Sequence, residues 1–165
     1  GGKMELGDSF TVQAPRERVY EFLTDPNSLA PVLPGIRGYE VHAPNNFKVS
    51  LIVGVAQVHG LMKVMMRVAE KDLNDSVVTF NGRANGIRSN VDFEIRFRLN
   101  DTPGGGTEVG WGGEASIVGQ LASAAGGLLE PIARKNIADS IEAVRVALES
   151  SDQPASAPEL RTEPS

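Results

Sequence analysis

The strongest constraint on the fold is a stretch of strict alternation between Val91 and Leu99. Successive side chains of a strand point to opposite faces, so this pattern predicts a strand with one apolar face and one charged face. A sheet with one solvated face is typically antiparallel, whereas parallel sheets are buried on both faces. The alternating residues are the apolar Val91, Phe93, Ile95, Phe97 and Leu99 and the charged Asp92, Glu94, Arg96 and Arg98.

Weaker alternation predicts further strands on both sides of this stretch. The apolar positions concerned fall within residues 4–12, 47–55, 62–68, 78–80 and 109–117. Clusters of Asn, Asp, Gly and Pro separate these segments and favour turns, so the chain is expected to form an antiparallel meander. The predicted turns are Asn45-Asn46, Leu73-Asn74-Asp75, Asn85-Gly86 and Pro103-Gly104-Gly105-Gly106.

Two short helices are predicted after the first strand. The first begins at Ala14-Pro15, since proline suits the start of a helix. Asp25-Pro26 caps the second, and Pro31 and Pro34 keep it short. This second helix is either a lid that opens at modest cost or an ordinary plug over the core. Its apolar residues are Leu29, Val32 and Leu33.

From Gly119 the apolar period becomes helical and continues to Leu148. Pro131 is expected to kink this long helix, and Gly126-Gly127 to weaken its first half. A curved sheet needs a cover for its apolar face, and this helix is the largest one available. The predicted fold is therefore α+β, with a curved antiparallel sheet wrapped around a long C-terminal helix. The helical stripe consists of Leu121, Ala125, Leu128, Ile132, Ile137, Ile141, Val144 and Leu148.

The length of 165 residues predicts one domain, assigned to residues 4–149. Residues 1–3 precede Met4 and are interpreted as foreign to the native chain, and residues 150–165 are expected to be a disordered tail. The net charge of -5 argues against nucleic acid as a partner. With neither an 18-residue apolar run nor a leader, the protein is expected to be soluble and cytoplasmic.

Residues suited to catalysis are sparse. His42 and His59 lack a second histidine or a cysteine at metal-ligand spacing, so no metal site is predicted. No G-x-S-x-G motif is present, which leaves no candidate serine nucleophile. The strand acids Asp92, Glu94 and Glu114 fall on the solvent-facing parity. We therefore expect no catalytic residues.

Composition indicates an incompletely filled core. Aromatic residues make up 5% of the chain, while there are 18 glycines. Small residues at 119–127 are expected to face Met62, Met66 and Trp111, which leaves either close backbone packing or an elongated apolar slot. Both alternatives remain open from the residues alone.

Three stretches carry a resemblance to a known family: Phe22–Gly35, Gly82–Leu99 and Gly104–Leu129. Their order and spacing resemble the G-subunit family of carbon monoxide dehydrogenase, within the START-like (SRPBCC, helix-grip) superfamily. The resemblance implies a hydrophobic cavity between sheet and long helix, with neither a shared catalytic triad nor a metal. It further implies an accessory, non-catalytic role.

The resemblance also implies a ligand and partners. The ligand would be an isoprenoid quinone, most naturally menaquinone, and the partner a molybdenum-containing carbon monoxide dehydrogenase that the protein couples to the membrane quinone pool in electron transfer. Peripheral association with the inner face of the cell membrane is expected. Leu29, Val32 and Leu33 would form the lid. The expected ligand contacts are Leu51, Val53, Met62, Val64, Met66, Phe80, Phe93, Ile95, Phe97, Val109, Trp111, Ala115, Leu121, Ala125, Leu128 and Leu129.

Two other classes stay open. A cyclase- or hydrolase-like helix-grip enzyme would require a buried polar pair, with His59, Arg83 or Arg88 inside the cavity. A ligand-free assembly factor would instead fill the cavity with its own side chains.

Overall fold

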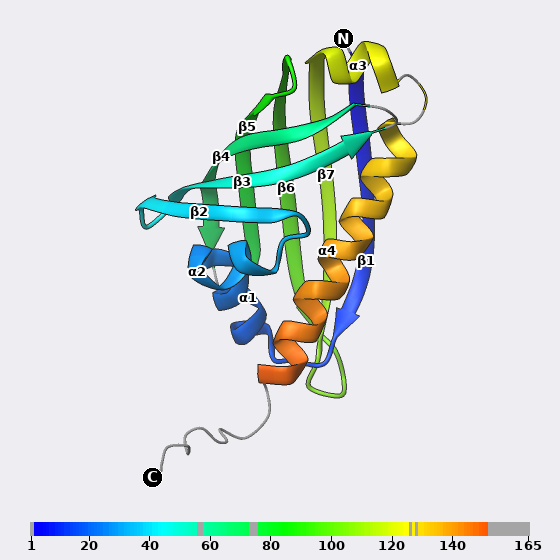
Figure 1. Cartoon of the computed structure of the whole chain (residues 1–165). Helices are drawn as coiled ribbons and strands as arrows, with labels where there is room; N and C mark the ends of the chain where they lie inside the picture. The colour runs from blue at the N-terminus through cyan, green and yellow to red at the C-terminus, as the bar shows by residue number, and fades with distance from the viewer. Residues whose placement is uncertain (1, 56–57, 73–75, 126, 128, 152–165) are drawn as a thin grey trace.

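The chain forms one seven-stranded antiparallel sheet with helices on its concave side (Figure 1). The computed structural model describes residues 2–55, 58–72, 76–125, 127 and 129–151. The strand order is β1-β7-β6-β5-β4-β3-β2, so the first and last strands pair at one edge and the others form a meander. The strands are β1 (Gly2–Val12), β2 (Ile36–Ala43), β3 (Asn46–Val55), β4 (Val58–Asp72), β5 (Val77–Gly86), β6 (Ser89–Asp101) and β7 (Thr107–Gly119).

The sheet is strongly curved. In Figure 1, β2, β3 and β4 cross in front of β5, β6 and β7 at a steep angle. The pairing of β4 with β5 shifts register between Val68 and Glu70, and such a bulge bends a strand and increases its twist. The curved sheet leaves one open side beside β1, where the C-terminal helix lies.

The short helices follow the predicted positions. Helix α1 (Arg16–Thr24) is followed by α2 (Pro26–Leu29) and the 3₁₀ turn η1 (Ala30–Val32). The Asp25 carboxylate accepts hydrogen bonds from the Asn27 backbone N–H at 3.0 Å and from Ser28 Oγ at 2.9 Å. Asp25 is thus the N-cap of α2, as the Asp-Pro pair predicts.

The C-terminal helix differs from the prediction in one respect. Instead of one helix kinked at Pro131, the chain forms α3 (Gln120–Ala125) and a separate α4 (Leu129–Ser151). Pro131 lies in the first turn of α4, where a backbone N–H has no intrahelical acceptor in any case. The predicted kink at Pro131 is therefore wrong, because proline costs little at that position.

The turn between β5 and β6 also differs from the prediction. It is formed by Ile87 and Arg88, two residues beyond the predicted Asn85-Gly86. Both residues have positive φ, 53° and 50° respectively, which suits a two-residue hairpin but is uncommon for a β-branched side chain. Ile87 is half-buried against the core, which offsets this backbone cost.

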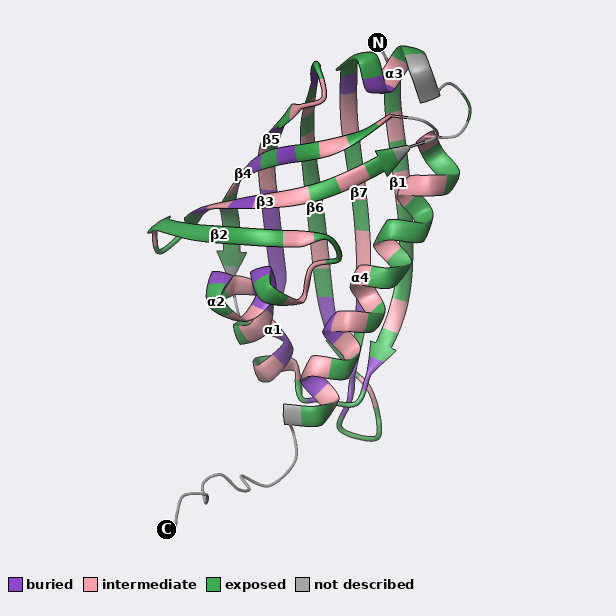
Figure 2. Ribbon diagram, in the orientation of Figure 1, coloured by how far each residue is buried: buried purple, intermediate pink, exposed green. Residues whose placement is uncertain are grey.

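The most tightly packed part of the core lies under α1 and the C-terminal end of α4 (Figure 2). Thr107 is fully buried there, and its Oγ1 donates a hydrogen bond to the Ala14 carbonyl at 2.7 Å. Away from this end, several inward-facing residues of β1 and β6, among them Leu6, Phe93 and Ile95, are only half-buried. The largest fully buried apolar side chains are Phe47, Phe80, Leu99, Leu148, Val12, Val19, Val49, Val78 and Val109.

Candidate ligand-binding cavity

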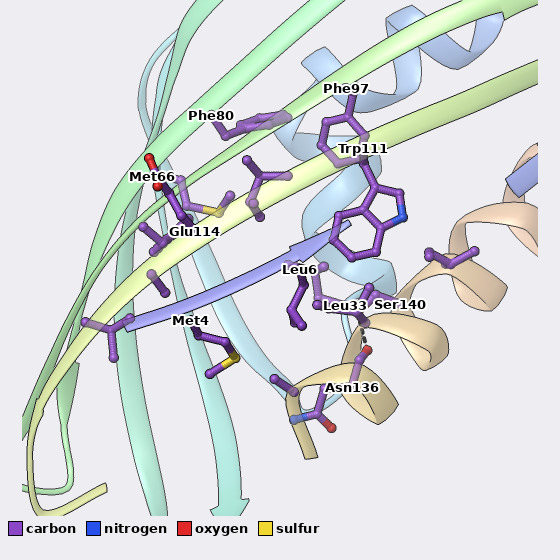
Figure 3. A pocket seen from close by; sticks show the side chains of 18 of the residues that line it. Met4, Leu6, Leu33, Met66, Phe80, Phe97, Trp111, Glu114, Asn136 and Ser140 are labelled. Atoms are coloured by element: carbon purple, nitrogen blue, oxygen red, sulfur yellow. Dashed lines mark hydrogen bonds between the residues drawn. The ribbon is translucent and has the colours of Figure 1, made fainter. Parts of the chain in front are cut away.

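A cavity of about 410 Å³ lies between the concave face of the sheet and α4 (Figure 3). Its volume falls within the range of about 300–1,000 Å³ that is usual for small-molecule sites. The lining is almost entirely apolar, so it favours an apolar guest. The lining residues are Met4, Leu6, Phe10, Leu23, Leu29, Leu33, Val53, Met66, Phe80, Val91, Phe93, Ile95, Phe97, Trp111, Gly113, Glu114, Ala115, Ile117, Leu121, Leu129, Ile132, Ala133, Asn136, Ile137, Ser140, Ile141 and Val144.

The register of neighbouring strands brings aromatic side chains together on one wall of the cavity. Phe97 on β6 is directly opposite Trp111 on β7. Phe80 on β5 meets Phe97 edge-on, with ring centroids 6.0 Å apart and planes at 89°. Side chains that share a face in neighbouring strands form one continuous surface. Three rings from three strands therefore form a wall at one end of the cavity.

Gly82 controls the position of a fourth ring. A Cβ at Gly82 would lie 2.7 Å from Cζ of Phe93 and 2.4 Å from the Met65 carbonyl oxygen. Because contacts this short do not occur, a glycine is required for Phe93 to lie across β5. Phe93 then lines the cavity beside Val91 and Ile95 of its own strand.

Helix α4 contributes the opposite wall. Its contributing residues recur at helical spacing from Ile132 to Val144, with two polar side chains, Asn136 and Ser140, among them. Asn136 is exposed, and Ser140 Oγ donates to the Asn136 carbonyl oxygen at 2.9 Å. The Ser140 hydroxyl hydrogen is thus used within the helix itself.

Trp111 carries the other polar group of the cavity lining. Its Nε1 is buried and, among the residues that the structure describes, is the one buried side-chain nitrogen or oxygen without a hydrogen-bond partner. Glu114 also borders the cavity but is exposed.

Most of the expected ligand contacts lie on the cavity wall. Leu51, Met62, Val64 and Val109 do not, although they face inward as expected: the last three are buried within the core and Leu51 packs against it. Strand parity predicts the face of a residue but not whether the space beyond it is filled. The predicted residues that line the cavity are Val53, Met66, Phe80, Phe93, Ile95, Phe97, Trp111, Ala115, Leu121 and Leu129.

The predicted lid is divided between two surfaces. Leu29 and Leu33 line the cavity, whereas Val32 borders a shallow hollow on the outer side of α4. Two further predicted contacts, the side chain of Ala125 and the whole of Leu128, lie outside the described residues.

The first strand supplies cavity residues that the sequence analysis did not single out. Met4, Leu6 and Phe10 reach the cavity because β1 pairs with β7 over its whole length. These residues share one parity, which was a usable signal for a common face. The α4 residues Ile137 and Ile141, expected on a helical stripe, also line the cavity.

The candidate polar residues of an enzyme lie elsewhere. His59, Arg83 and Arg88 are exposed and absent from the cavity lining, and Arg83 pairs with Asp92 at 2.7 Å on the outer face. His42 is exposed too. Within the described part of the chain, no group of three or more His, Cys, Asp or Glu residues is placed to hold a metal ion.

The sequence matches a known family model over nearly the whole domain. The model for the G-subunit of carbon monoxide dehydrogenase (CoxG) matches residues 8–149. The chain belongs to the CoxG family. No curated protein matches the chain. In the described residues of this CoxG-family chain, no helix is both long and apolar enough to cross a membrane.

Solved structures share the fold of this CoxG-family chain at low sequence identity. A conserved protein from Geobacillus kaustophilus has a TM-score of 0.81 at 20% identity, with 90% of this chain and 97% of that chain covered. The ZhuI aromatase/cyclase from a Streptomyces species has a TM-score of 0.70 at 18% identity, covering 93% and 98%. Ara h 8.0201 has a TM-score of 0.62 at 16% identity, covering 90% and 99%. These similarities establish the helix-grip fold.

Proposed function

We propose that this protein binds an isoprenoid quinone, with menaquinone as the best-fitting candidate, in the cavity between sheet and α4. The observation that carries the proposal is the cavity itself, about 410 Å³ in volume and lined almost wholly by apolar side chains. Each CH₂ group that leaves water for such a site contributes about 0.8 kcal/mol. In this proposal the cavity holds the ring head group and the first part of its isoprenoid chain, and the rest of the chain leaves towards the start of α4.

The apolar lining favours binding over catalysis. The polar side chains from α4 are Asn136, which is exposed, and Ser140, whose hydroxyl bonds to the helix backbone. General acid–base chemistry needs a positioned titratable group within reach of the substrate. The ZhuI aromatase/cyclase shares the fold at 18% identity, which supports no transfer of its activity.

The family supplies the proposed partner. Membership of the CoxG family supports the proposal that this protein is an accessory protein that assists a molybdenum-containing carbon monoxide dehydrogenase. In this proposal the protein holds the quinone that receives electrons from the enzyme, and thereby couples the enzyme to the membrane quinone pool. The protein works in the cytoplasm, peripherally associated with the inner face of the cell membrane.

The outer face of β4 is the surface best suited to membrane contact. Leu61 and Met65 are 43% and 44% exposed, and they alternate with Lys63 and Arg67. Ile52, opposite Leu61 on β3, is 41% exposed. Neither Lys63 nor Arg67 has an ion pair within the described residues. Exposed apolar groups beside such cations suit a surface of anionic lipids.

Vesicle sedimentation tests this surface. The protein is expected to sediment with vesicles that contain phosphatidylglycerol, and a variant with Lys63→Glu and Arg67→Glu to remain in solution. Lys135→Glu, a charge reversal on the exposed side of α4, is the control and should sediment like the wild type. Equal sedimentation of all three proteins would exclude this face as the docking surface.

Calorimetric titration with a short-chain menaquinone tests the ligand. Ala133→Phe places a ring in the cavity, whereas Ala138→Phe places the same ring on the exposed face of α4. The first variant should bind at least about tenfold more weakly, a loss of about 1.4 kcal/mol, and the second should match the wild type. A wild-type protein that takes up no quinone would overturn the proposal and leave a ligand-free assembly factor as the better account.

A further inference from the structure

The buried N–H of Trp111 is the one polar feature of the cavity that the fold leaves unexplained. Tryptophan donates a single hydrogen bond through Nε1, and buried indole N–H groups usually have an acceptor. Here, among the described residues, Nε1 is buried without one. A donor in this state costs free energy until an acceptor is supplied, because its bond to water is lost on burial.

No neighbouring group among the described residues accepts a hydrogen bond from this N–H. Asp8 is directly opposite Trp111 in the pairing of β1 with β7, so its side chain is on the same face. Its carboxylate is exposed, and Oδ1 accepts a hydrogen bond from the Ser9 backbone N–H at 2.8 Å. On α4, Ser140 donates its hydroxyl hydrogen to the helix backbone. Neither side chain accepts a hydrogen bond from the indole in this structure, so the N–H can donate to a ligand that enters the cavity.

The surroundings of Trp111 indicate the shape of the group that carries this acceptor. Phe97 lies opposite Trp111 on the neighbouring strand, and Phe80 meets Phe97 edge-on (Figure 3). Aromatic rings pack favourably against other flat conjugated rings. At the other end, Leu121, Leu129 and Ile132 offer a purely aliphatic wall.

We infer that the cavity is polarised, with a ring-and-carbonyl subsite at Trp111 and an aliphatic channel towards the start of α4. The indole N–H donates to a carbonyl oxygen of the ligand, and the ring that bears this oxygen packs against Phe80 and Phe97. This inference rests on the proposed function and deepens it: the protein selects a lipid with a carbonyl on a flat ring over a hydrocarbon of equal shape. The ring enters first, since Phe80 borders the tightly packed core.

Two matched ligands and one substitution test the inference. The ligands are a short-chain menaquinone and the same molecule with a methylnaphthalene ring, which lacks both carbonyl oxygens. Trp111→Phe keeps an aromatic ring but removes the N–H. Calorimetry is expected to show about five- to tenfold weaker binding of the quinone to this variant, with the affinity for the naphthalene compound unchanged. The Trp111→Phe protein should unfold at the wild-type denaturant concentration or above, since it no longer buries an unpaired donor.

A spectroscopic readout is independent of affinity. The chain has one tryptophan, so its ¹⁵N–¹H spectrum holds a single indole N–H signal. This signal should move downfield on addition of the quinone and stay nearly in place with the naphthalene compound. Asp8→Ala should leave both the quinone affinity and this shift unchanged.

The outcomes separate the inference from the proposed function. If Trp111→Phe binds the quinone as tightly as the wild type, or loses affinity for both ligands equally, the donor role is overturned while quinone binding stands. A loss of quinone affinity in Asp8→Ala equal to that in Trp111→Phe also overturns it, because the carboxylate then takes part. If the wild type binds neither ligand, the proposed function itself fails.

Discussion

Two regions of the same sheet differ in how completely they are filled. On β1, Val12 is fully buried, whereas Leu6 on the same face is half-buried and lines the cavity. On β6, Leu99 is 2% exposed, whereas Phe93 is again half-buried beside the cavity. The strands and their parity are the same in both regions. The difference therefore comes from what covers them.

Among the described residues, hydrogen bonds join α4 to the rest of the molecule near its C-terminal end. Near its C-terminus, the Glu149 carboxylate accepts from the Gln13 backbone N–H at 2.9 Å, Arg145 Nε donates to the Thr11 carbonyl at 3.3 Å and Arg18 donates to the Leu148 carbonyl at 3.3 Å. The ion pairs of its N-terminal half instead run along the helix, from Arg134 to Glu130 at 2.9 Å and Lys135 to Asp139 at 3.0 Å. Exposed pairs of this kind contribute little.

This division separates stability from binding. Close packing at the core end supplies the dispersion and hydrophobic contributions that hold the fold together. At the cavity end the helix stands away from the sheet, and the apolar surface there is left available to a ligand. One end of the sheet thus belongs to the close-packed core, and the other end lines the cavity.

The largest expected effect on stability comes from a comparison of the same substitution, Leu→Ala, made separately in each region. Leu148→Ala at the fully buried end should lower the free energy of unfolding by about 2–5 kcal/mol, because a new cavity opens in close-packed surroundings. Leu6→Ala should cost about 1 kcal/mol, because its side chain is half-buried and already borders open space. Urea unfolding at equilibrium measures both. Equal losses would show that the cavity end is packed as tightly as the core end.

A smaller effect is expected from a buried hydrogen bond at the core end. Thr107→Val keeps the shape of the side chain but leaves the Ala14 carbonyl without its 2.7 Å bond, which should cost about 1–3 kcal/mol. Thr11→Val, at an exposed position of β1, is the control and should change the unfolding free energy by less than about 0.5 kcal/mol. Equal changes in the free energy of unfolding for the two variants would contradict the close packing of the core end.

The smallest effect concerns α2, which carries part of the predicted lid. Asp25→Ala removes the N-cap of α2, which should destabilise this turn by about 1 kcal/mol. We expect faster amide hydrogen exchange in residues 27–32, with little change at the core strands β5 and β6. Glu21→Ala on the exposed face of α1 serves as the comparison and should leave the exchange pattern intact. A uniform increase in amide exchange over the whole chain would instead show that α2 unfolds together with the core.

Features that depend on neighbouring residues could be predicted from the sequence. The alternation from Val91 to Leu99 predicts β6 with the correct inner face, and its inward residues Phe93, Ile95 and Phe97 line the cavity. The Asp25-Pro26 pair predicts the cap of α2 because an aspartate side chain bonds to amides two or three residues ahead. Local chemistry determines both features.

Features that depend on the pairing of strands far apart in the sequence, or on how deeply a side chain is buried, could not be predicted. The cavity contacts of Met4 and Leu6 follow from the pairing of β1 with β7, which no local pattern specifies. Met62 and Val64 have the same parity as Met66, yet they are buried in the core while Met66 borders the cavity. Strand parity alone does not distinguish them, because it does not tell how much space lies beyond each side chain.

The pairing of β1 with β7 also determines the order in which the sheet and the cavity can form during synthesis of the chain. Gly2 pairs with Ile117 and Val12 with Thr107, so β1 meets its neighbour only when β7 has been synthesised. Strands β2 to β7 form by local hairpins, whereas β1 pairs only after a long loop has closed, which is slow. The cavity needs β1, β7 and α4 together and is therefore the last part of the molecule to form. A nascent chain has most of its sheet before it has anywhere to hold a ligand.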